Sequence, residues 1–363
     1  MVQKNFKEPD MEDVVVIGAG VSGLAAARAL HQSGYQVAVV DKSRGLGGRL
    51  ATRRRNDAVI DHGCRYLEPF TNSSLSPIAE LVASGTLQPW QPKAFELGAD
   101  GALSAVAASA VYAAPEGMSS VAKNLAQGLT IHRHWRAIAI TPLAHGWRVE
   151  AARGDSHRQS NTLEAKAVVV AIPAPQIADL LQASSEYKGV KALLKQLDLV
   201  SFDAVITVMA GYRSSDPASP LAQLDSQGWI IASSTHPALR WAALDSSKRA
   251  RQQEPVAVFH SSPEFAASAS DKSDLEPVGQ ALLAAIAPCG EWLLSPQWMQ
   301  VHRWRYGFVR QALGSTILSS ALLPNLIGCG DWCSGGHVEG AIASGRRAAA
   351  AAADFLSQQK RHN

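Results

Sequence analysis

A glycine-rich turn constrains the fold of this chain more than any other feature. The run Val14 to Ile17 is short and β-branched, and it stops at a glycine. Gly18, Gly20 and Gly23 then complete the pattern G-x-G-x-x-G. In this pattern the first glycine permits a tight turn, the second lets the backbone approach a pyrophosphate, and the third lets a helix pack closely on the strand. Free N–H groups at the start of that helix favour a bound anion.

A second strand ending in a carboxylate follows the turn. Leu24 to Gly34 is rich in good helix formers and closes on a glycine, as helix C-termini often do. Gln36 to Val40 is then interpreted as a buried strand, and Asp41 stands 23 residues after Gly18. An acid about 20 residues beyond the first glycine is typical of ribose binding. Strand, glycines, helix and acid together predict a dinucleotide-binding unit, and the alternative is a βαβ turn without a nucleotide.

A second pair of glycines lies in a basic stretch just after this acid. From Lys42 to Asn56 the sequence holds six basic residues and no acidic residue. Gly47 and Gly48 give backbone access, and Arg49 offers a fork of donors, which together suit a second phosphate cradle. A solvated basic loop is the alternative. A simple NAD domain does not need this second pair, whereas a longer ligand held at both ends of its pyrophosphate does.

A second helix start late in the chain has an obvious use for such a long ligand. Leu326 to Gly328 is interpreted as a short strand, which leads to Gly330 and Asp331 and then to an alanine-rich helix at Gly340 to Ala352. FAD is long enough to need contacts at both ends. Asp331 would bind its ribityl or pyrophosphate region, and the amides of Val338 to Ala341 would face the N1–C2=O edge of the flavin. A turn with a helix cap is the alternative.

Composition limits the other functional classes. The 363 residues are 47% apolar and 18% charged, which suits a soluble two-domain protein. The net charge of +3 does not indicate nucleic-acid binding, and no 18-residue apolar run predicts a membrane span. The four cysteines show no zinc spacing, so we expect no metal and a reducing cytoplasm. Cys329 and Cys333 stand four apart, and a redox pair there is an open alternative to buried thiols.

The expected fold is α/β, with a Rossmann-type FAD-binding domain and a discontinuous second domain built on a mostly antiparallel sheet with helices. After a flexible tail at 1–12, the FAD-binding domain takes residues 13–70, 115–180 and 320–358. The substrate domain takes residues 71–114 and 181–319. Further strands are expected at 129–132, 137–140, 147–151, 165–172, 199–209, 228–232 and 256–260, the first three as a meander. Further helices are expected at 76–84, 120–127 and 277–287.

With these motifs in place, the chain resembles the renalase-like family, a branch of the FAD-dependent amine oxidases with a glutathione-reductase-type FAD domain. The resemblance runs through nearly the whole chain. Its motifs are VVVIGAGVSGLAAA at 14–27, DKSRGLGGRLATRR at 41–54, DHGCRY at 61–66, AIPAPQ at 171–176, LDSSKRAR at 244–251, VHRWRYG at 301–307 and CGDWCSGGHVEGAIASG at 329–345. The first two motifs and the last indicate FAD in many flavoproteins, while the others are narrower.

The resemblance implies a noncovalent FAD enzyme. Similar proteins oxidise dihydronicotinamide dinucleotides reduced at ring position 2 or 6, return NAD(P)+ and pass electrons to O2, which gives hydrogen peroxide. Three departures from the pattern stand where the flavin or the substrate entrance is expected, which puts the substrate in question. They are Cys64-Arg65, Gly307-Phe308-Val309 and His337.

The expected site residues fall into four groups. The residues expected to contact FAD are Gly18, Ala19, Gly20, Val21, Ser22, Gly23, Asp41, Lys42, Ser43, Arg44, Gly47, Gly48, Arg49, Leu50, His62, Gly63, Ala137, Ala171, Gly330, Asp331, Val338, Glu339, Gly340 and Ala341. The residues expected at the reacting ring are His62, Tyr66, Arg305 and His337. A basic mouth for a dinucleotide would use Lys248, Arg251, His302, Arg303, Arg305 and Arg310. The pocket walls would be Tyr66, Trp304 and Tyr306.

Two rival functions remain open at this point. An oxidase of small amines in the same fold would need an aromatic cage and no basic mouth. A non-catalytic FAD-fold binding protein would tolerate a degraded flavin site, whereas the glycine motifs here are all present. The expected partners are therefore a small dinucleotide substrate and O2, with no nucleic acid and no membrane, for a monomer or homodimer.

Overall fold

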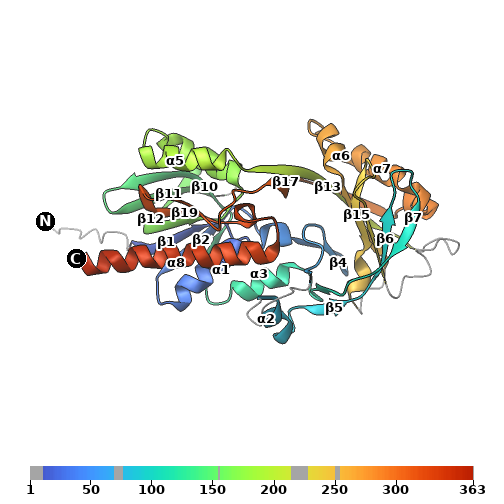
Figure 1. Cartoon of the computed structure of the whole chain (residues 1–363), viewed down its shortest axis with the longest axis horizontal. Helices are drawn as coiled ribbons and strands as arrows, with labels where there is room; N and C mark the ends of the chain where they lie inside the picture. The colour runs from blue at the N-terminus through green and yellow to red at the C-terminus, as the bar shows by residue number, and fades with distance from the viewer. Residues whose placement is uncertain (1–10, 69–76, 154–155, 214–227, 250–253, 363) are drawn as a thin grey trace. The chain divides into compact units, whose positions relative to one another are not determined.

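The structure is a computed structural model that describes residues 11–68, 77–153, 156–213, 228–249 and 254–362 (Figure 1). The chain divides into two compact units. Unit 1 comprises residues 1–48, 122–201 and 309–363, and unit 2 comprises residues 49–121 and 202–308. Residues 1–10 of the predicted tail lie outside the described part, and Glu12 already begins the first strand.

Unit 1 is built on a sheet whose centre is parallel. The parallel strands are β1 (Glu12–Ile17), β2 (Val37–Asp41), β9 (Thr130–Arg133), β12 (Ser156–Val170) and β19 (Leu323–Gly328). Three more strands extend it in antiparallel pairing, namely β10 (Trp135–Leu143), β11 (Gly146–Arg153) and β18 (Leu318–Ser320). Parallel strands buried on both faces have continuous apolar sequences, which is why the runs VVVI, VAVV and AVVV could be recognised as strands.

Helices cover both faces of this sheet (Figure 1). On one face α8 (Val338–His362) runs beside α1 (Val21–Gln32). A Cβ added at Gly345 would lie 2.1 Å from the carbonyl oxygen of Ser22, so the two helices cross with their backbones in contact. On the other face lie α4 (Ala174–Leu181) and α5 (Lys188–Leu197). The short helix α3 (Ser119–Leu125) contributes Leu125 to the core of unit 1.

Unit 2 contains a second sheet, ordered β17-β13-β16-β15-β14-β6-β7. Its strands are β6 (Lys93–Leu97), β7 (Leu103–Val106), β13 (Ser201–Gly211), β14 (Trp229–Ala232), β15 (Leu239–Leu244), β16 (Val256–Ser261) and β17 (Trp298–Gln311). The pairs joining β13, β16, β15 and β14 are antiparallel, and β14 pairs with β6 in parallel. The mostly antiparallel second sheet predicted from the sequence is therefore confirmed.

Different elements cover the two faces of this second sheet. One apolar cluster joins alternate sheet residues such as Val208 and Phe259 to Leu282 of α7 (Glu276–Ala285). The short helix α6 (Pro263–Ser268) precedes α7. On the other face Met209 and Val258 pack with Ile60. That cover comes from two small antiparallel pairs, β3 (Thr52–Arg55) with β4 (Ala58–Asp61) and β5 (Gln88–Trp90) with β8 (Val111–Ala113). Helix α2 (Pro77–Ala83) is a further short helix of unit 2.

The structure corrects several boundaries expected from the sequence. Residues 49–70 were expected in the FAD-binding domain, yet 49–68 belong to unit 2, because Ile60 packs on the second sheet. Residues 181–201 belong to unit 1, since a Cβ at Gly189 would meet Leu323 at 2.4 Å. The expected first strand of the meander, β9, instead pairs in parallel with β2. Helix α8 runs on to His362, and the sequence reasoning missed α4, α5 and the long strand β17. In the described part, no helix has the length and apolar character needed to cross a membrane.

Candidate functional site

Of the three glycines in the glycine-rich turn of unit 1, one faces open space. Gly18 has a φ of +108°, and a Cβ there would lie 2.5 Å from the carbonyl oxygen of Ala171. A Cβ at Gly23 would lie 2.0 Å from the carbonyl oxygen of Gly18, so α1 packs on the turn backbone to backbone. A Cβ at Gly20 would meet nothing within 4 Å. The close contacts explain two glycines structurally, and Gly20 at the start of α1 is left for a ligand.

Asp41 is tied to the same turn. The amide of Ala19 donates to its Oδ2 at 2.7 Å, and the amide of Ser43 donates to its Oδ1 at 2.6 Å. A carboxylate oxygen can accept more than one hydrogen bond, so each oxygen retains capacity for a ribose hydroxyl. The acid at the end of β2 thus fixes the turn and still offers acceptors beside it.

The second glycine pair lies directly against the first turn. The amide of Gly47 donates to the carbonyl oxygen of Ala19 at 2.8 Å, and Gly47 forms a bridge with Gly20. Gly47 and Gly48 have φ values of +105° and +55°, which favour glycine, and a Cβ at Gly48 would lie 3.6 Å from Cα of Gly20. Two glycine stretches that are separate in the sequence therefore form one backbone surface. Arg49 belongs to unit 2, where its Nη1 donates to the carbonyl oxygen of Gly307 at 3.4 Å.

The late Gly-Asp pair lies at the same edge of the sheet as the glycine turn. In the parallel register Ile17 stands opposite Val170, and Val170 opposite Gly328, so β1, β12 and β19 end in line. The amide of Gly330 donates to Ser344 Oγ at 3.1 Å, which ties this end to α8. With strands about 4.8 Å apart, the two chain segments leave the sheet roughly 10 Å from one another.

The N-terminal turn of α8 follows this edge. The carbonyl oxygen of Asp331 accepts the amides of Gly335 and Gly336 at 3.0 and 2.9 Å, which folds the chain back before α8 begins at Val338. First-turn amides of a helix have no partner within it and favour negative charge. His337, expected at the reacting ring, is exposed just before this turn. Unit 1 thus brings together two glycine stretches, Asp41 and a second helix start.

The remaining residues expected at FAD are divided between the units. Ala171 follows β12 and contacts Gly18, whereas Ala137 lies at a bulge of the outer strand β10. Leu50, His62 and Gly63 belong to unit 2 with Arg49. A Cβ at Gly63 would lie 2.0 Å from the carbonyl oxygen of Arg49, so these two loops touch through their backbones.

A buried network of four charges holds the loop after β4 in unit 2. Lys248 Nζ lies 2.6 Å from Asp245 Oδ1 and 3.6 Å from Asp61 Oδ2, and all three side chains are 0% exposed. Arg249 pairs with both carboxylates. Burial opposes ionisation of Asp245, but Lys248 and Arg249 outweigh burial and hold its pKa below the ordinary value. The carboxylate of Asp61 also accepts the amide of Met118 at 2.8 Å.

This network corrects the predicted basic mouth. Lys248 forms buried ion pairs, and Arg303 donates to the carbonyl oxygens of Ser270 and Lys272, so both side chains already have partners within unit 2. His302 is half-buried, and burial together with Arg53 lowers its pKa, so it adds no charge near neutral pH. Arg305 and Arg310 are exposed on β17. Arg251 lies outside the described residues.

Three rings meet after Asp61. His62 stacks on His302 with centroids 5.2 Å apart, and the indole N–H of Trp304 donates to the His62 carbonyl oxygen at 2.9 Å. Burial, His302 and Arg53 lower the pKa of His62 to about 3, so its imidazole is neutral. Trp304 was expected as a pocket wall, and in the structure this hydrogen bond holds the backbone of His62. Tyr306, the other expected wall on this strand, instead contacts Phe202 edge-on at 5.5 Å.

Tyr66 and Arg65 lie over the aromatic face of the second sheet. The ring of Tyr66 is 6.2 Å from both Trp90 and Trp241, and burial raises its pKa. The guanidinium carbon of Arg65 lies 5.0 Å from the Trp241 ring and 5.8 Å from the Phe308 ring. Among the described residues no carboxylate pairs with Arg65. This half-buried cation was noticed in the sequence only as a departure from the family pattern.

Sequence reasoning missed a row of polar side chains beneath Arg65. Thr207 stands opposite His260 in the strand register, and His260 opposite Trp241. Directly opposite residues share one face of an antiparallel sheet, so the three side chains lie side by side. Burial, Arg65, His62 and Lys248 lower the pKa of His260 well below 6.5, so the imidazole is neutral. The only signal in the sequence was a single polar residue within each of the apolar runs AVITVMA and VAVFH.

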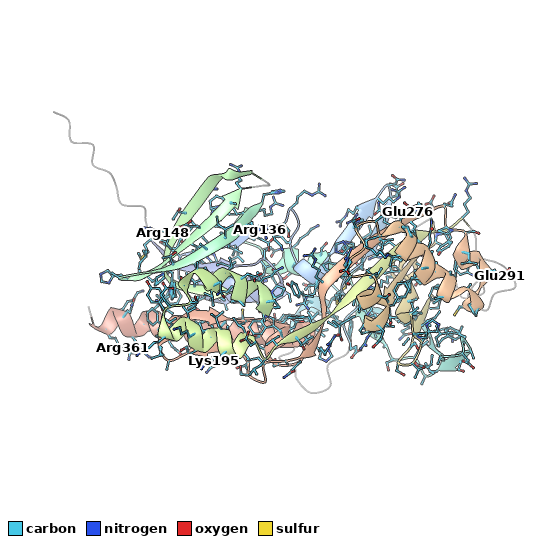
Figure 2. The ribbon with its side chains drawn as sticks, turned by 90° about the horizontal axis from the view of Figure 1, so that it is seen from above. Arg136, Arg148, Lys195, Glu276, Glu291 and Arg361 are labelled. Atoms are coloured by element: carbon cyan, nitrogen blue, oxygen red, sulfur yellow. The ribbon has the colours of Figure 1, made fainter. Side chains whose placement is uncertain are left out.

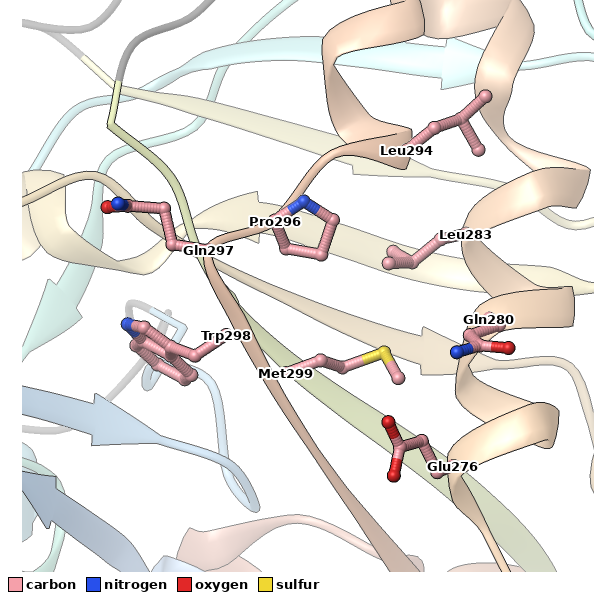
Figure 3. Close-up of a pocket in the computed structure, with 8 residues that line it drawn as sticks. All are labelled: Glu276, Gln280, Leu283, Leu294, Pro296, Gln297, Trp298 and Met299. Carbon is pink, nitrogen blue, oxygen red and sulfur yellow. The ribbon is translucent and has the colours of Figure 1, made fainter.

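Charged side chains and a surface pocket lie elsewhere. Figure 2 labels exposed charges of unit 1 such as Arg136 and Arg148, and the latter pairs with Glu164 at 2.8 Å. A pocket of about 510 Å³ in unit 2 lies between α7 and the start of β17 (Figure 3). Its lining residues are Glu276, Gln280, Leu283, Leu294, Pro296, Gln297, Trp298 and Met299. None of them belongs to the predicted site, so we do not assign the site to this pocket.

Known proteins match this chain at the level of both sequence and structure. Residues 16–81 match the family described as "NAD(P)-binding Rossmann-like domain". Flavin-containing amine oxidase B of Cavia porcellus is 46% identical over 70 residues, and polyamine oxidase 5 of Oryza sativa subsp. japonica is 40% identical over 70 residues. Each match covers 19% of this chain and only 14% of the relative. A redesigned triple mutant of putrescine oxidase superposes with a TM-score of 0.70 at 16% identity, covering 96% of this chain and 99% of its own, which shows a shared fold.

The decisive match covers most of the chain. Residues 93–353 match the family described as "Flavin containing amine oxidoreductase". The residues of unit 1 fit the flavin dinucleotide of that family, because open space at Gly20, the acceptors of Asp41 and the start of α8 lie along one sheet edge. The chain therefore belongs to the family of flavin-containing amine oxidoreductases, which are FAD-dependent enzymes, and FAD is its cofactor.

Proposed function

We propose that this protein is an oxidase of dihydronicotinamide dinucleotides reduced at ring position 2 or 6, which it converts to NAD(P)+. When bound noncovalently, FAD would supply the hydride acceptor, and O2 would take up the two electrons to give hydrogen peroxide. The residues of unit 1 would bind the cofactor through backbone amides and Asp41, and the residues around Arg65 in unit 2 would bind the substrate ring.

The unpaired cation of Arg65 is the observation that carries this proposal. Arg65 lies over the rings of Tyr66 and Trp241 at 5.5 and 5.0 Å, and no described carboxylate neutralises it. An ammonium substrate about 5 Å from this charge would be repelled by roughly 3 kcal/mol at an effective dielectric constant of 20. A dihydronicotinamide ring is uncharged and escapes that repulsion, and its planar face suits aromatic walls.

The proposed reaction does not require a catalytic base. When a dihydronicotinamide loses hydride, an aromatic pyridinium remains and no proton has to be removed. The residues then need only orient the ring and exclude water. This agrees with His62 and His260, because burial lowers the pKa of both imidazoles and makes them weak bases near neutral pH.

Oxidation of small amines is the second candidate. The match to the flavin-containing amine oxidoreductase family favours it, and so do the three rings of Tyr66, Trp90 and Trp241, which could receive an alkylamine in its neutral form. A non-catalytic binding protein is disfavoured, because the glycine surface of unit 1 is intact.

Anaerobic rapid mixing of the purified yellow protein decides between the two oxidases. We expect the flavin absorbance to bleach faster with 6-dihydro-NAD than with putrescine or benzylamine. In Arg65→Met the preference for 6-dihydro-NAD over amines should become smaller, because the ammonium group is no longer repelled. Arg148→Met, which removes a charge from an exposed ion pair, is the matched control and should keep the wild-type preference. Bleaching by amines alone would refute the dihydronicotinamide proposal, and a protein without bound flavin would refute both oxidase functions.

A further inference from the structure

Three consecutive arginines on β3 belong to the basic stretch after Asp41, and none of the contacts expected with FAD uses them. Arg53, Arg54 and Arg55 stand at the end of this stretch. Within the described part of the chain, none of the three pairs with a carboxylate. Successive side chains of a strand point to opposite sides, so Arg53 and Arg55 share one face and Arg54 lies on the other. The three charges therefore divide between two surfaces of unit 2.

Arg53 and Arg55 face one side of β17. The guanidinium carbon of Arg55 lies 4.9 Å from the Trp298 ring, and Arg53 Nη1 donates to Gln300 Oε1 at 3.2 Å. The next residue on this side of β17 is His302. Burial and the charge of Arg53 lower the pKa of His302, so the guanidinium acts directly on this imidazole. Arg53 thus stands beside Gln300 and His302.

These three side chains offer hydrogen-bond donors and no negative charge. Gln300 Oε1 accepts from Arg53, and among the described residues no group accepts from Gln300 Nε2 or from the His302 ring. A guanidinium carries five N–H groups and a neutral imidazole carries one. All three side chains are partly exposed, so a ligand can reach them from solvent. Several donors grouped around an arginine without an acid suit a phosphate group.

This group of donors adjoins the residues proposed to bind the substrate ring. His302 stacks on His62 with centroids 5.2 Å apart, and His260 hydrogen-bonds the backbone of His62. The ring of His260 lies 5.2 Å from that of Trp241, over which Arg65 stands. A series of contacts within unit 2 therefore joins the two regions. The pyrophosphate of a nicotinamide dinucleotide is one ribose away from its ring, which suits two adjacent subsites.

We propose that Arg53, Gln300 and His302 form the subsite for the pyrophosphate of the dinucleotide substrate. The inference rests on the function proposed above. Arg53 supplies a permanent charge, while Gln300 Nε2 and the N–H of His302 supply neutral hydrogen bonds to the phosphate oxygens. The subsite replaces the basic mouth expected from the sequence, in which Lys248 and Arg303 already have partners. It favours substrates that carry phosphate over nicotinamides that do not.

The test uses the FAD-loaded enzyme, so that the cofactor already fills its own phosphate cradle. Arg53→Met removes the charge and keeps the aliphatic part of the side chain. Arg54→Met is the matched control, because it removes the same charge from the next residue, which donates to the carbonyl oxygen of Glu116 at 2.9 Å on the other face of the strand. Gln300→Met removes one neutral donor and keeps Arg53. Bound flavin, measured by absorbance, shows that each variant folds.

Calorimetric titration with inorganic pyrophosphate tests the subsite independently of catalysis. We expect Arg53→Met to weaken pyrophosphate binding about 10-fold to 100-fold, the value of one hydrogen bond to a charged group. Gln300→Met should weaken binding about fivefold, and Arg54→Met should weaken it less than about threefold, because an exposed charge is screened. Wild-type enzyme that binds no pyrophosphate, or equal losses in the two arginine variants, would overturn the subsite.

Anaerobic flavin reduction then tests whether the substrate is the occupant. The dissociation constants compared are those of 6-dihydro-NAD and of 6-dihydronicotinamide riboside, which has the same ring and no phosphate. Arg53→Met should weaken the dinucleotide about 10-fold to 100-fold and leave the riboside within about twofold. Equal effects on both would overturn the assignment to the substrate and leave free phosphate as the occupant. If neither compound reduces the wild-type flavin, the proposed function fails and the substrate assignment with it, while the pyrophosphate titration still decides whether the anion site exists.

Discussion

Alanine at position 20 should separate folding from cofactor binding. A Cβ at Gly20 meets no atom within 4 Å, and the backbone there has a φ of −72° and a ψ of 172°, which alanine adopts without strain. The variant should therefore fold, at a cost of about 1 kcal/mol or less for a poorer helix cap. The added methyl group nevertheless occupies the space from which the backbone would approach the FAD pyrophosphate.

The expected loss of FAD affinity follows from the hydrogen bonds that the methyl group blocks. Displacing the pyrophosphate from the start of α1 would break about two hydrogen bonds from amides to charged oxygens, each contributing about 1.5–3 kcal/mol. A loss of about 3–6 kcal/mol corresponds to a dissociation constant raised roughly 100-fold to 10,000-fold, since 1.4 kcal/mol is tenfold. Such a change is far larger than the stability cost.

The assay measures bound flavin by absorbance and the unfolding midpoint of apoprotein by circular dichroism. Gly20→Ala should lose flavin with a nearly unchanged apoprotein midpoint. Gly23→Ala is the opposite control, because its Cβ would lie 2.0 Å from the Gly18 carbonyl oxygen and must disrupt the fold. Gly34→Ala, with open space and a φ of +83°, reports the cost of a methyl group away from the site. Flavin content equal to the wild type in Gly20→Ala would refute the placement of the pyrophosphate.

Two further predictions concern the buried charges of unit 2. Lys248→Met should lower the free energy of unfolding by about 3–5 kcal/mol in urea, because Asp61 and Asp245 lose a buried partner. Lys166→Met, at a partly exposed ion pair, should lower it by less than about 1 kcal/mol, and similar losses in the two variants would contradict the network's role. The pKa of His62 falls from 6.5 to about 3 on folding, so the unfolded chain binds the extra proton and stability is lost as pH falls below 6.5. Between pH 6.5 and 5 the wild type should lose about 2 kcal/mol more than His62→Gln, and parallel unfolding curves would contradict this.

The parts of the fold that the sequence predicted are those fixed by local patterns. The strands around Val15 and Val168 are buried on both faces, so their apolar runs stand out from the neighbouring residues. Gly18 and Gly47 have positive φ values, which favour glycine, so their turns can be recognised from the glycines in the sequence. Even there the pattern gave only part of the reason, since Asp41 was expected at a ribose and also proves to anchor the turn through Ala19.

The polar row on the second sheet escaped prediction because long-range register creates it. Thr207 and His260 are 53 residues apart in the chain and become neighbours only when β13 and β16 pair. A lone histidine in an apolar strand looks like any core residue until its hydrogen-bond partners can be sought. The misplaced Lys248 has the same origin, because a charge that follows a strand looks solvated in the sequence, and only the approach of Asp61 from β4 buries it.

The two units offer different chemical groups to a ligand. Unit 1 presents backbone amides and glycines, which fit a pyrophosphate and leave few chemical alternatives for the cofactor. Unit 2 presents side chains, and under the proposed function the charge of Arg65 would disfavour a cationic substrate. If the proposed function holds, an exchange at Arg65 should change substrate preference without changing how the flavin is held, because Arg65 belongs to unit 2 and the glycine turn to unit 1.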